Sequence, residues 1–169
     1  MPNGWQKMRG TMMRKRIISQ DDQVSSPPDQ DWLDVESLAL AEVTSEDPAH
    51  PIESALLPDS GSDWRASYPG DQTIRLLFDE PLHLKRIRLE FHEEQFERTQ
   101  EFTLRWSDDG GQSYQLIVRQ QFNFSPPQTT SEIEDYSVDF DGVMALELRI
   151  VPDISGSNIR ASLAGLLLA

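Results

Sequence analysis

The sequence predicts an all-β fold in which two layers of strands pack face to face. Several segments alternate strictly between apolar and polar residues; Ile87, Leu89 and Phe91 are the apolar positions of one of them. This period of two is typical of strands with one buried and one wet face. Segments rich in Asp and Gly, such as residues 107–111, separate the alternating stretches. With no long amphipathic helix in between, the periodicity predicts a β-sandwich or a barrel.

About eight antiparallel strands are expected. In chain order they lie at residues 32–43, 73–79, 84–91, 102–106, 114–118, 136–140, 145–151 and 161–169. The first of them has a break near Glu36 and Ser37, and Leu38 and Leu40 are expected to lie within it. Such strands need a second layer to cover their apolar face, because an isolated meander is only marginally stable in water.

The sequence also predicts the connections between the strands. Residues 44–63 are rich in turn-forming residues, with one helical turn expected just after Pro51. Residues 125–135 and 152–160 are expected to be loops, and a turn is expected at residues 141–142. We expect Trp106 to be buried, because it shares a strand face with Phe102 and Leu104.

Charge is distributed unevenly along the chain. The net charge is −14, yet residues 1–18 carry +5, so the remaining residues carry −19. An acidic body repels phosphate backbones, which disfavours nucleic acid as a partner. No apolar run approaches the length of a membrane span. Residues 1–31 are expected to form a disordered tail, basic and then acidic, ahead of one domain at residues 32–169.

Composition also bears on location. The chain has no cysteine, which excludes disulfides and thiolate sites. The basic start leads directly into polar residues without the apolar core of a secretory signal, so a cytoplasmic location is expected. Met1, Met12 and Met13 remain alternative starts.

Several segments, taken in order, resemble those of discoidin-like domains, also called F5/8 type C or galactose-binding-like domains. Residues 106–114 are similar to the family's serine–aspartate–glycine turn that leads to an aromatic residue, and residues 145–150 to its penultimate strand. Residues 55–64 resemble the loop that ends in the family's core tryptophan, here Trp64. The resemblance implies a jelly-roll β-sandwich over residues 32–169, with the last strand near the first.

The resemblance also raises the question of calcium. Many sugar-binding members hold a structural calcium in the loop before the core tryptophan, and Asp59 and Asp63 offer the oxygen ligands that calcium prefers. In those members a glutamate on the last strand completes the site, and here that strand has no acid. Weak or absent calcium binding is therefore expected, with no cofactor. The alternative is that the two aspartates shape a turn.

No motif for catalysis is present. His50, His83 and His92 are far apart in sequence, and the chain lacks a nucleophile elbow, a zinc-protease motif and a phosphate loop. We therefore expect a non-catalytic, monomeric binding module. The resemblance implies carbohydrate binding through loops at one end of the sandwich, at residues 65–70, 92–100 and 119–128. The candidate ligand-binding residues are Arg65, Tyr68, His92, Phe96, Arg98, Arg119, Phe122 and Asn123.

A protein partner is the alternative to a carbohydrate. Several intracellular members of the fold are scaffolds, and docking would use the loops or an arginine-lined sheet face. The outward arginines are Arg75, Arg86, Arg88, Arg105 and Arg149. They also have a purely structural interpretation, since cross-strand pairs with Glu90 and Glu147 would stabilise the sheet. Phe122 likewise fits a core position as well as a binding one.

Overall fold

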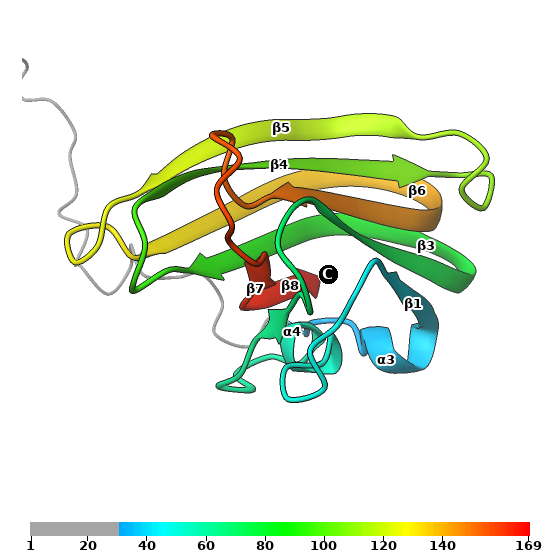
Figure 1. The fold of residues 1–169 in the computed structure, drawn as a ribbon. Coiled ribbons are helices and arrows are strands. Elements are labelled where there is room, and N and C mark those ends of the chain that lie inside the picture. The colour runs from blue at the N-terminus through cyan, green and yellow to red at the C-terminus, as the bar shows by residue number, and fades with distance from the viewer. Residues whose placement is uncertain (1–30) are drawn as a thin grey trace, which may run out of the picture. The chain divides into compact units, whose positions relative to one another are not determined.

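The computed structural model describes residues 31–169 (Figure 1). The tail expected at residues 1–31 and the alternative start methionines lie, apart from Asp31, outside the described residues. The elements are α3 (Val35–Leu38), β1 (Ala39–Val43), α4 (Glu53–Leu56), β2 (Trp64–Arg65), β3 (Gln72–His92), β4 (Arg98–Ser107), β5 (Gln115–Phe124), β6 (Ser131–Val151), β7 (Ser162–Leu163) and β8 (Gly165–Leu168). Within residues 31–169, no helix is long and apolar enough to cross a membrane.

Two long strands, β3 and β6, pass through both layers of a sandwich. Their segments at residues 72–78 and 145–151 lie in a five-stranded layer with the order β1-β3-β6-β4-β5. Their other segments, residues 84–92 and 131–140, pair with each other, and β8 joins them on β3 to make a three-stranded layer. All pairs between these strands are antiparallel, and Figure 1 shows both long strands bending back at the same side. This confirms the all-β jelly-roll prediction.

The bend is made by bulges. The pairing of β3 with β6 shifts register between Leu77 and Leu82 and again on either side of Leu84. Gly142 lies at the bend with a φ of 70°, which a residue with a side chain adopts only at a cost. The turn expected at residues 141–142 is therefore a bulge inside one strand.

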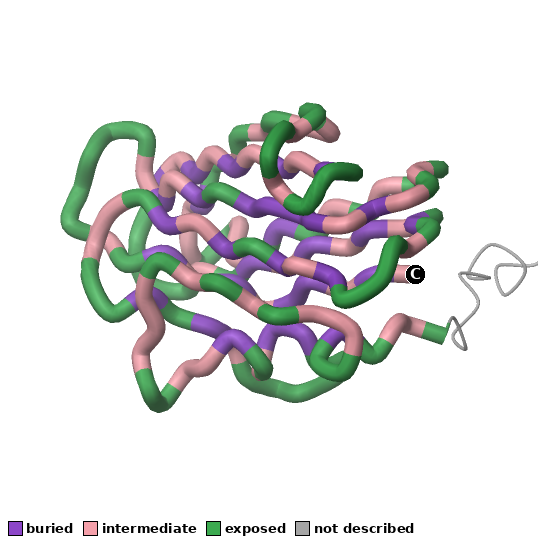
Figure 2. The backbone as a smooth tube through the Cα atoms, turned by 90° about the vertical axis from the view of Figure 1, so that its right-hand side faces the viewer, coloured by how far each residue is buried: buried purple, intermediate pink, exposed green. Residues whose placement is uncertain are grey.

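The core lies between the layers, and buried stretches alternate with exposed ones along the strands (Figure 2). Phe91 from the three-stranded layer stacks on Phe102 from the five-stranded layer, with ring centroids 5.4 Å apart. Trp64 is fully buried and donates a hydrogen bond from Nε1 to the carbonyl of Ser45. Trp106, expected to be buried, is only partly so; it stacks on Phe140 at the edge of the core.

Four strand assignments require correction. The first strand begins at Ala39 after a helical turn, and Leu40 is 61% exposed, because β1 pairs with β3 in the register that turns Ala41 inward. The strand expected at residues 114–118 runs instead over Gln115–Phe124, where a bulge in its pairing with β4 leaves Leu116 exposed.

The third correction concerns the expected loop at residues 125–135. Strand β6 begins inside it at Ser131, and the inward position is Glu132 while Ile133 faces outward. A buried acidic residue beside an exposed apolar one reverses the usual alternation. The residue pattern therefore did not predict a strand here. The last strand, expected as one piece, is divided into β7, which pairs with β2, and β8, which pairs with β3. It lies near the first segment, as expected: the amide of Leu33 donates to the carbonyl of Leu168.

Candidate functional site

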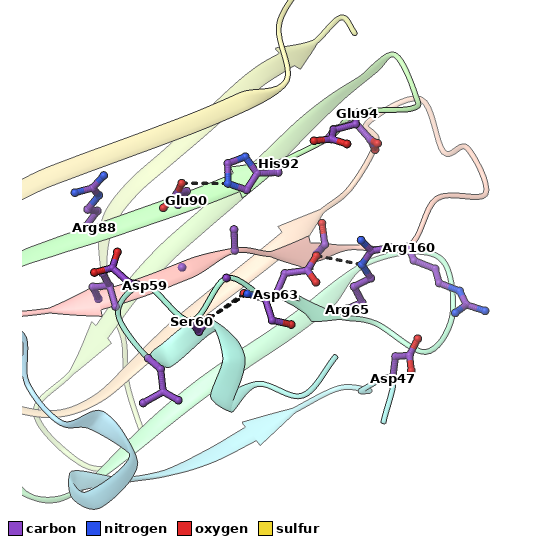
Figure 3. Close-up of a pocket in the computed structure, with 18 of the residues that line it drawn as sticks. Asp47, Asp59, Ser60, Asp63, Arg65, Arg88, Glu90, His92, Glu94 and Arg160 are labelled. Carbon is purple, nitrogen blue, oxygen red and sulfur yellow. Dashed lines mark hydrogen bonds and ion pairs between the residues drawn. The ribbon is translucent and has the colours of Figure 1, made fainter. Parts of the chain in front are cut away.

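A groove of about 1110 Å³ lies on the outer face of the three-stranded layer (Figure 3). Its floor carries side chains of β3, because Ile87, Leu89 and Phe91 point into the core and the residues between them point outward. Residues 57–63, between α4 and β2, form one wall, and residues 93–96, after β3, border one end.

Arg88, Glu90 and His92 are the outward residues of β3 on the groove floor. Glu90 Oε1 lies 3.1 Å from His92 Nε2, an ion pair when the histidine is protonated. Figure 3 shows Asp59 on the facing loop, across from Arg88. Donors and acceptors therefore alternate along the floor and recur on the wall.

The guanidinium of Arg88 makes no hydrogen bond to another described residue. Its Nε is buried and has no hydrogen-bond partner among the described residues. Arg88 lies opposite Asp135 in the strand register, but Asp135 accepts hydrogen bonds from Nε and Nη2 of Arg86 instead. Those bonds hold the pKa of Asp135 below its usual value. Arg88 is thus left with one buried, unsatisfied donor, and its guanidinium stands on the groove floor without an acceptor from the described residues.

Other groove residues are held by neighbours. Asp63 lies 2.7 Å from Nδ1 of His50 and accepts a hydrogen bond from Nε of Arg65 at 3.1 Å. Arg65 is still about half exposed, so part of its guanidinium faces solvent. These contacts fix the wall of the groove and orient Arg65 beside it.

Two aromatic side chains border the groove. Phe96, in the segment after β3, is 54% exposed. Trp32 is partly buried, and the guanidinium of Arg86 lies 4.8 Å from the centroid of its ring. Exposed aromatic rings beside polar groups suit ligands that have both an apolar face and hydroxyl groups.

The expected metal ligands Asp59 and Asp63 both line the groove. Asp63 is already engaged by His50 and Arg65, and no group of three or more His, Asp or Glu side chains in residues 31–169 is placed to hold a metal ion. Asp59 has a φ of 54°, the left-handed conformation that aspartate tolerates in turns. This geometry fits the interpretation in which the two aspartates shape a turn.

The structure brings some of the expected ligand-binding residues together and separates others. Arg65, His92 and Phe96 line the groove. Tyr68 is exposed but lies outside it, and so does the whole segment at residues 119–128. Within that segment, Arg119 donates a hydrogen bond to Glu101, and Asn123 accepts one from the hydroxyl of Thr99. Phe122 packs against the core beside Phe124.

Arg98 requires a correction, because it is buried and does not reach the groove. Only 3% of Arg98 is exposed, and its guanidinium donates to Glu93, to Gln100 and to the carbonyl of Pro152. Burial would raise the pKa of Glu93, but the hydrogen bond from Arg98 brings it below its usual value. Arg98 therefore anchors the segment that carries Phe96 instead of binding a ligand.

Sequence reasoning missed Arg88, Glu90, Arg160 and Trp32 as groove residues. The alternation in β3 did place Arg88 and Glu90 on an outward face, which was the available signal. It could not show that the loop at residues 57–63 stands beside that face.

The arginine-lined face of the five-stranded layer is internally paired. Arg75 and Arg105 both donate to Glu147, and Arg149 donates to Asp71. Glu147 is buried, which would raise its pKa, yet these bonds lower it below the usual value. The face thus fits the structural interpretation, in which cross-strand pairs stabilise the sheet.

Comparison with solved structures identifies the fold. The family 32 carbohydrate-binding module of C. perfringens NanJ, solved with galactose, aligns with a TM-score of 0.57 and 14% identity over 79% of this chain and 94% of that one. The corresponding module of AlyQ, in complex with 4,5-unsaturated mannuronic acid, gives 0.59 and 13% over 83% and 98%. A chitosan-binding module from a Paenibacillus chitosanase/glucanase gives 0.52 and 15% over 78% and 94%.

These likenesses establish a discoidin-like, galactose-binding-like fold. No protein-family model matches the sequence. No curated protein matches it either.

Proposed function

We propose that this chain is a non-catalytic carbohydrate-binding module whose ligand lies in the groove on the three-stranded layer. The observation that carries the proposal is Arg88, whose guanidinium stands on the floor of an open groove with no hydrogen bond to another described residue. A sugar hydroxyl is a suitable acceptor for the terminal Nη groups of this guanidinium, and Glu90 and Asp59 are acceptors for the hydroxyl's own proton. The proposal assigns binding to the sandwich of residues 32–169.

The aromatic rim supports the same class of ligand. A pyranose ring has an apolar face that stacks on an aromatic side chain, and its edge carries hydroxyl groups that need planar donors and acceptors. Phe96 supplies an exposed ring, and Arg65 and Arg88 supply planar polar groups. Two of the solved modules that share the fold contain a bound ligand, galactose in one and 4,5-unsaturated mannuronic acid in the other, which makes carbohydrates the first class to test.

Isothermal titration calorimetry with hexasaccharides tests the proposal. The panel contains hexamers of galactose, glucosamine, galacturonate and mannuronate. We expect at least one to bind and Arg88→Gln to weaken that binding by about tenfold, the cost of one lost charge-assisted hydrogen bond of ~1.5 kcal/mol. The matched control is Arg149→Gln, which also removes an outward arginine but lies on the other layer and pairs with Asp71.

Thermal unfolding of both variants separates binding from folding. Arg149→Gln should bind as the unmodified chain does. Failure of all four hexamers to bind would reject the proposal. Equal losses in the two variants would show that Arg88 has no special role in binding.

A further inference from the structure

We propose that the groove binds an interior stretch of a linear glycan lying along β3, and not a single terminal sugar. This inference rests on the carbohydrate-binding function proposed above and specifies its ligand. It is carried by the placement of the two aromatic residues, by the spacing of polar groups on the floor and by the shape of that floor.

The aromatic residues lie at opposite ends of the groove. Trp32 packs on Arg86, near the middle of β3, whereas Phe96 follows the end of that strand at His92. Arg86 and His92 are six positions apart on the extended strand, so their Cα atoms are ~20 Å apart at ~3.3 Å per residue. That distance is several times the width of one sugar ring. One monosaccharide therefore cannot contact both rings, whereas an oligosaccharide can stack on each.

The polar groups recur along the same line. Arg88, Glu90 and His92 occupy alternate positions of β3 and so point to the same side, with Cα atoms ~6.6 Å apart. The side chains of Glu90 and His92 meet in one pair. The guanidinium of Arg88 and the Glu90–His92 pair therefore follow one another along the strand, as polar contacts to successive units of a sugar chain require. A site for one terminal sugar would instead gather its polar groups around a single point.

The floor is kept low by small residues. Gly165 pairs with Glu90 in the strand register, and Ala164 and Gly165 both line the groove. At Gly165 the outward position carries no side chain, so nothing rises from β8 to divide the groove at this point. The volume of about 1110 Å³ exceeds the range of ~300–1,000 Å³ usual for pockets that enclose one small molecule.

A length series tests the inference. Oligomers of one to six units of galactose, glucosamine, galacturonate and mannuronate are titrated into the full chain by calorimetry. In a series that binds, we expect the hexamer to bind more than about tenfold more tightly than the monosaccharide, with a plateau once the groove is filled. A smaller gain in affinity would be the statistical effect alone, because a hexamer presents six copies of the unit to a site that binds one.

Substitutions at the two ends of the groove test whether the bound glycan reaches both. Trp32→Ala and Phe96→Ala should each weaken hexamer binding by about tenfold, as expected for loss of a stacked aromatic ring. At least one of them should leave monosaccharide binding unchanged. Tyr68→Ala is the matched control, because Tyr68 is an exposed aromatic residue outside the groove. Since Trp32 also packs on Arg86, the length series on the unmodified chain gives an answer even if Trp32→Ala unfolds.

The outcomes distinguish the two proposals. Binding without dependence on length, or loss of hexamer binding from only one end, would overturn the extended-chain inference and leave carbohydrate binding intact. Absence of binding in all four series would reject carbohydrate binding itself.

Discussion

Glu132 is the residue at which the interior departs most from an apolar core. It is 1% exposed, Gln100 donates a hydrogen bond to Oε1, and Oε2 has no hydrogen-bond partner in the described part of the chain. Burial, together with the neighbouring carboxyl of Glu134, raises the pKa of Glu132 to about 8. The protonated form is therefore the one that suits this site, because an ionised carboxylate here would be both desolvated and close to a second acid.

The pKa of Glu132 predicts how stability depends on pH. In the unfolded chain Glu132 ionises near its ordinary value of 4.5, whereas in the folded chain it holds its proton to about 8. The folded state thus binds more protons between these values, so the contribution of Glu132 to stability is full below pH 4.5 and is lost as pH rises to about 8. Glu132→Gln removes the titration and keeps the shape and the polar contact.

We expect Glu132→Gln to match the unmodified chain near pH 4 and to exceed its stability by more than ~1 kcal/mol above pH 8, given ~1.4 kcal/mol per unit of pKa shift. Urea unfolding of both proteins across this range is the measurement. A difference between the two that does not change with pH would contradict the assigned protonation.

At the scale of elements, the fold depends on two strands that each serve both layers. The bulges near Leu82 and Gly142 allow β3 and β6 to bend back without breaking their pairing. Pro81 lies within this irregular part of β3, where a missing amide donor is tolerated. The bend also determines the site, because it brings the second part of β3 into the three-stranded layer that forms the groove floor.

Gly142 tests the importance of the bend. No atom lies within 4 Å of the position that a Cβ would occupy, so the cost of Gly142→Ala comes from its φ of 70° alone. We expect a loss of ~1–2 kcal/mol in the free energy of unfolding. Gly165→Ala is the control: its φ is outside the left-handed region, and its added Cβ would meet Glu90 Cβ at an ordinary 3.5 Å. Chemical denaturation should show little change in the free energy of unfolding for the control. If Gly142→Ala loses no more stability than Gly165→Ala, the bend does not require glycine.

At the scale of the whole molecule, the acidic charge bears on the choice of glycan. The chain carries −14, and in the groove lining the acids outnumber the arginines. The acids are Asp47, Asp59, Asp63, Glu90, Glu93 and Glu94, and the arginines are Arg65, Arg88 and Arg160. The field of such a body attracts cationic chains and repels anionic ones.

Among hexamers of equal length, glucosamine should therefore bind more tightly than galacturonate at low ionic strength. Salt should narrow the difference, and most of it should disappear near 1 M, where the Debye length is only ~3 Å. Calorimetry of both hexamers across a salt series checks this. Tighter binding of galacturonate at low salt would mean that Arg88 recognises a carboxylate and that this local contact outweighs the charge of the whole chain.

The sequence by itself determined most of the residues with which the long strands enter the core. The alternation placed Ile87, Leu89, Phe91, Phe102, Leu104, Leu146, Leu148 and Ile150 inside, and all are buried. Trp64 and the helical turn after Pro51 were also predicted. The inward positions follow from local periodicity, since a strand in a two-layer sandwich must turn its apolar side chains to one face wherever its neighbours lie. Trp64 was predicted from the family resemblance, and the helical turn from Pro51 at its start.

Only the tertiary structure decided which outward residues form the site. Arg75 and Arg88 occupy equivalent outward positions in the alternation of β3, yet Arg75 meets Glu147 across the sheet. The buried Nε of Arg88 has no such acceptor in residues 31–169, because Arg86 takes Asp135. The difference depends on strand register, and the groove beside Arg88 depends on a loop some 30 residues earlier in the chain. Alternation fixes the face on which a side chain lies, but its partners come from pairing between distant segments, which no local pattern encodes.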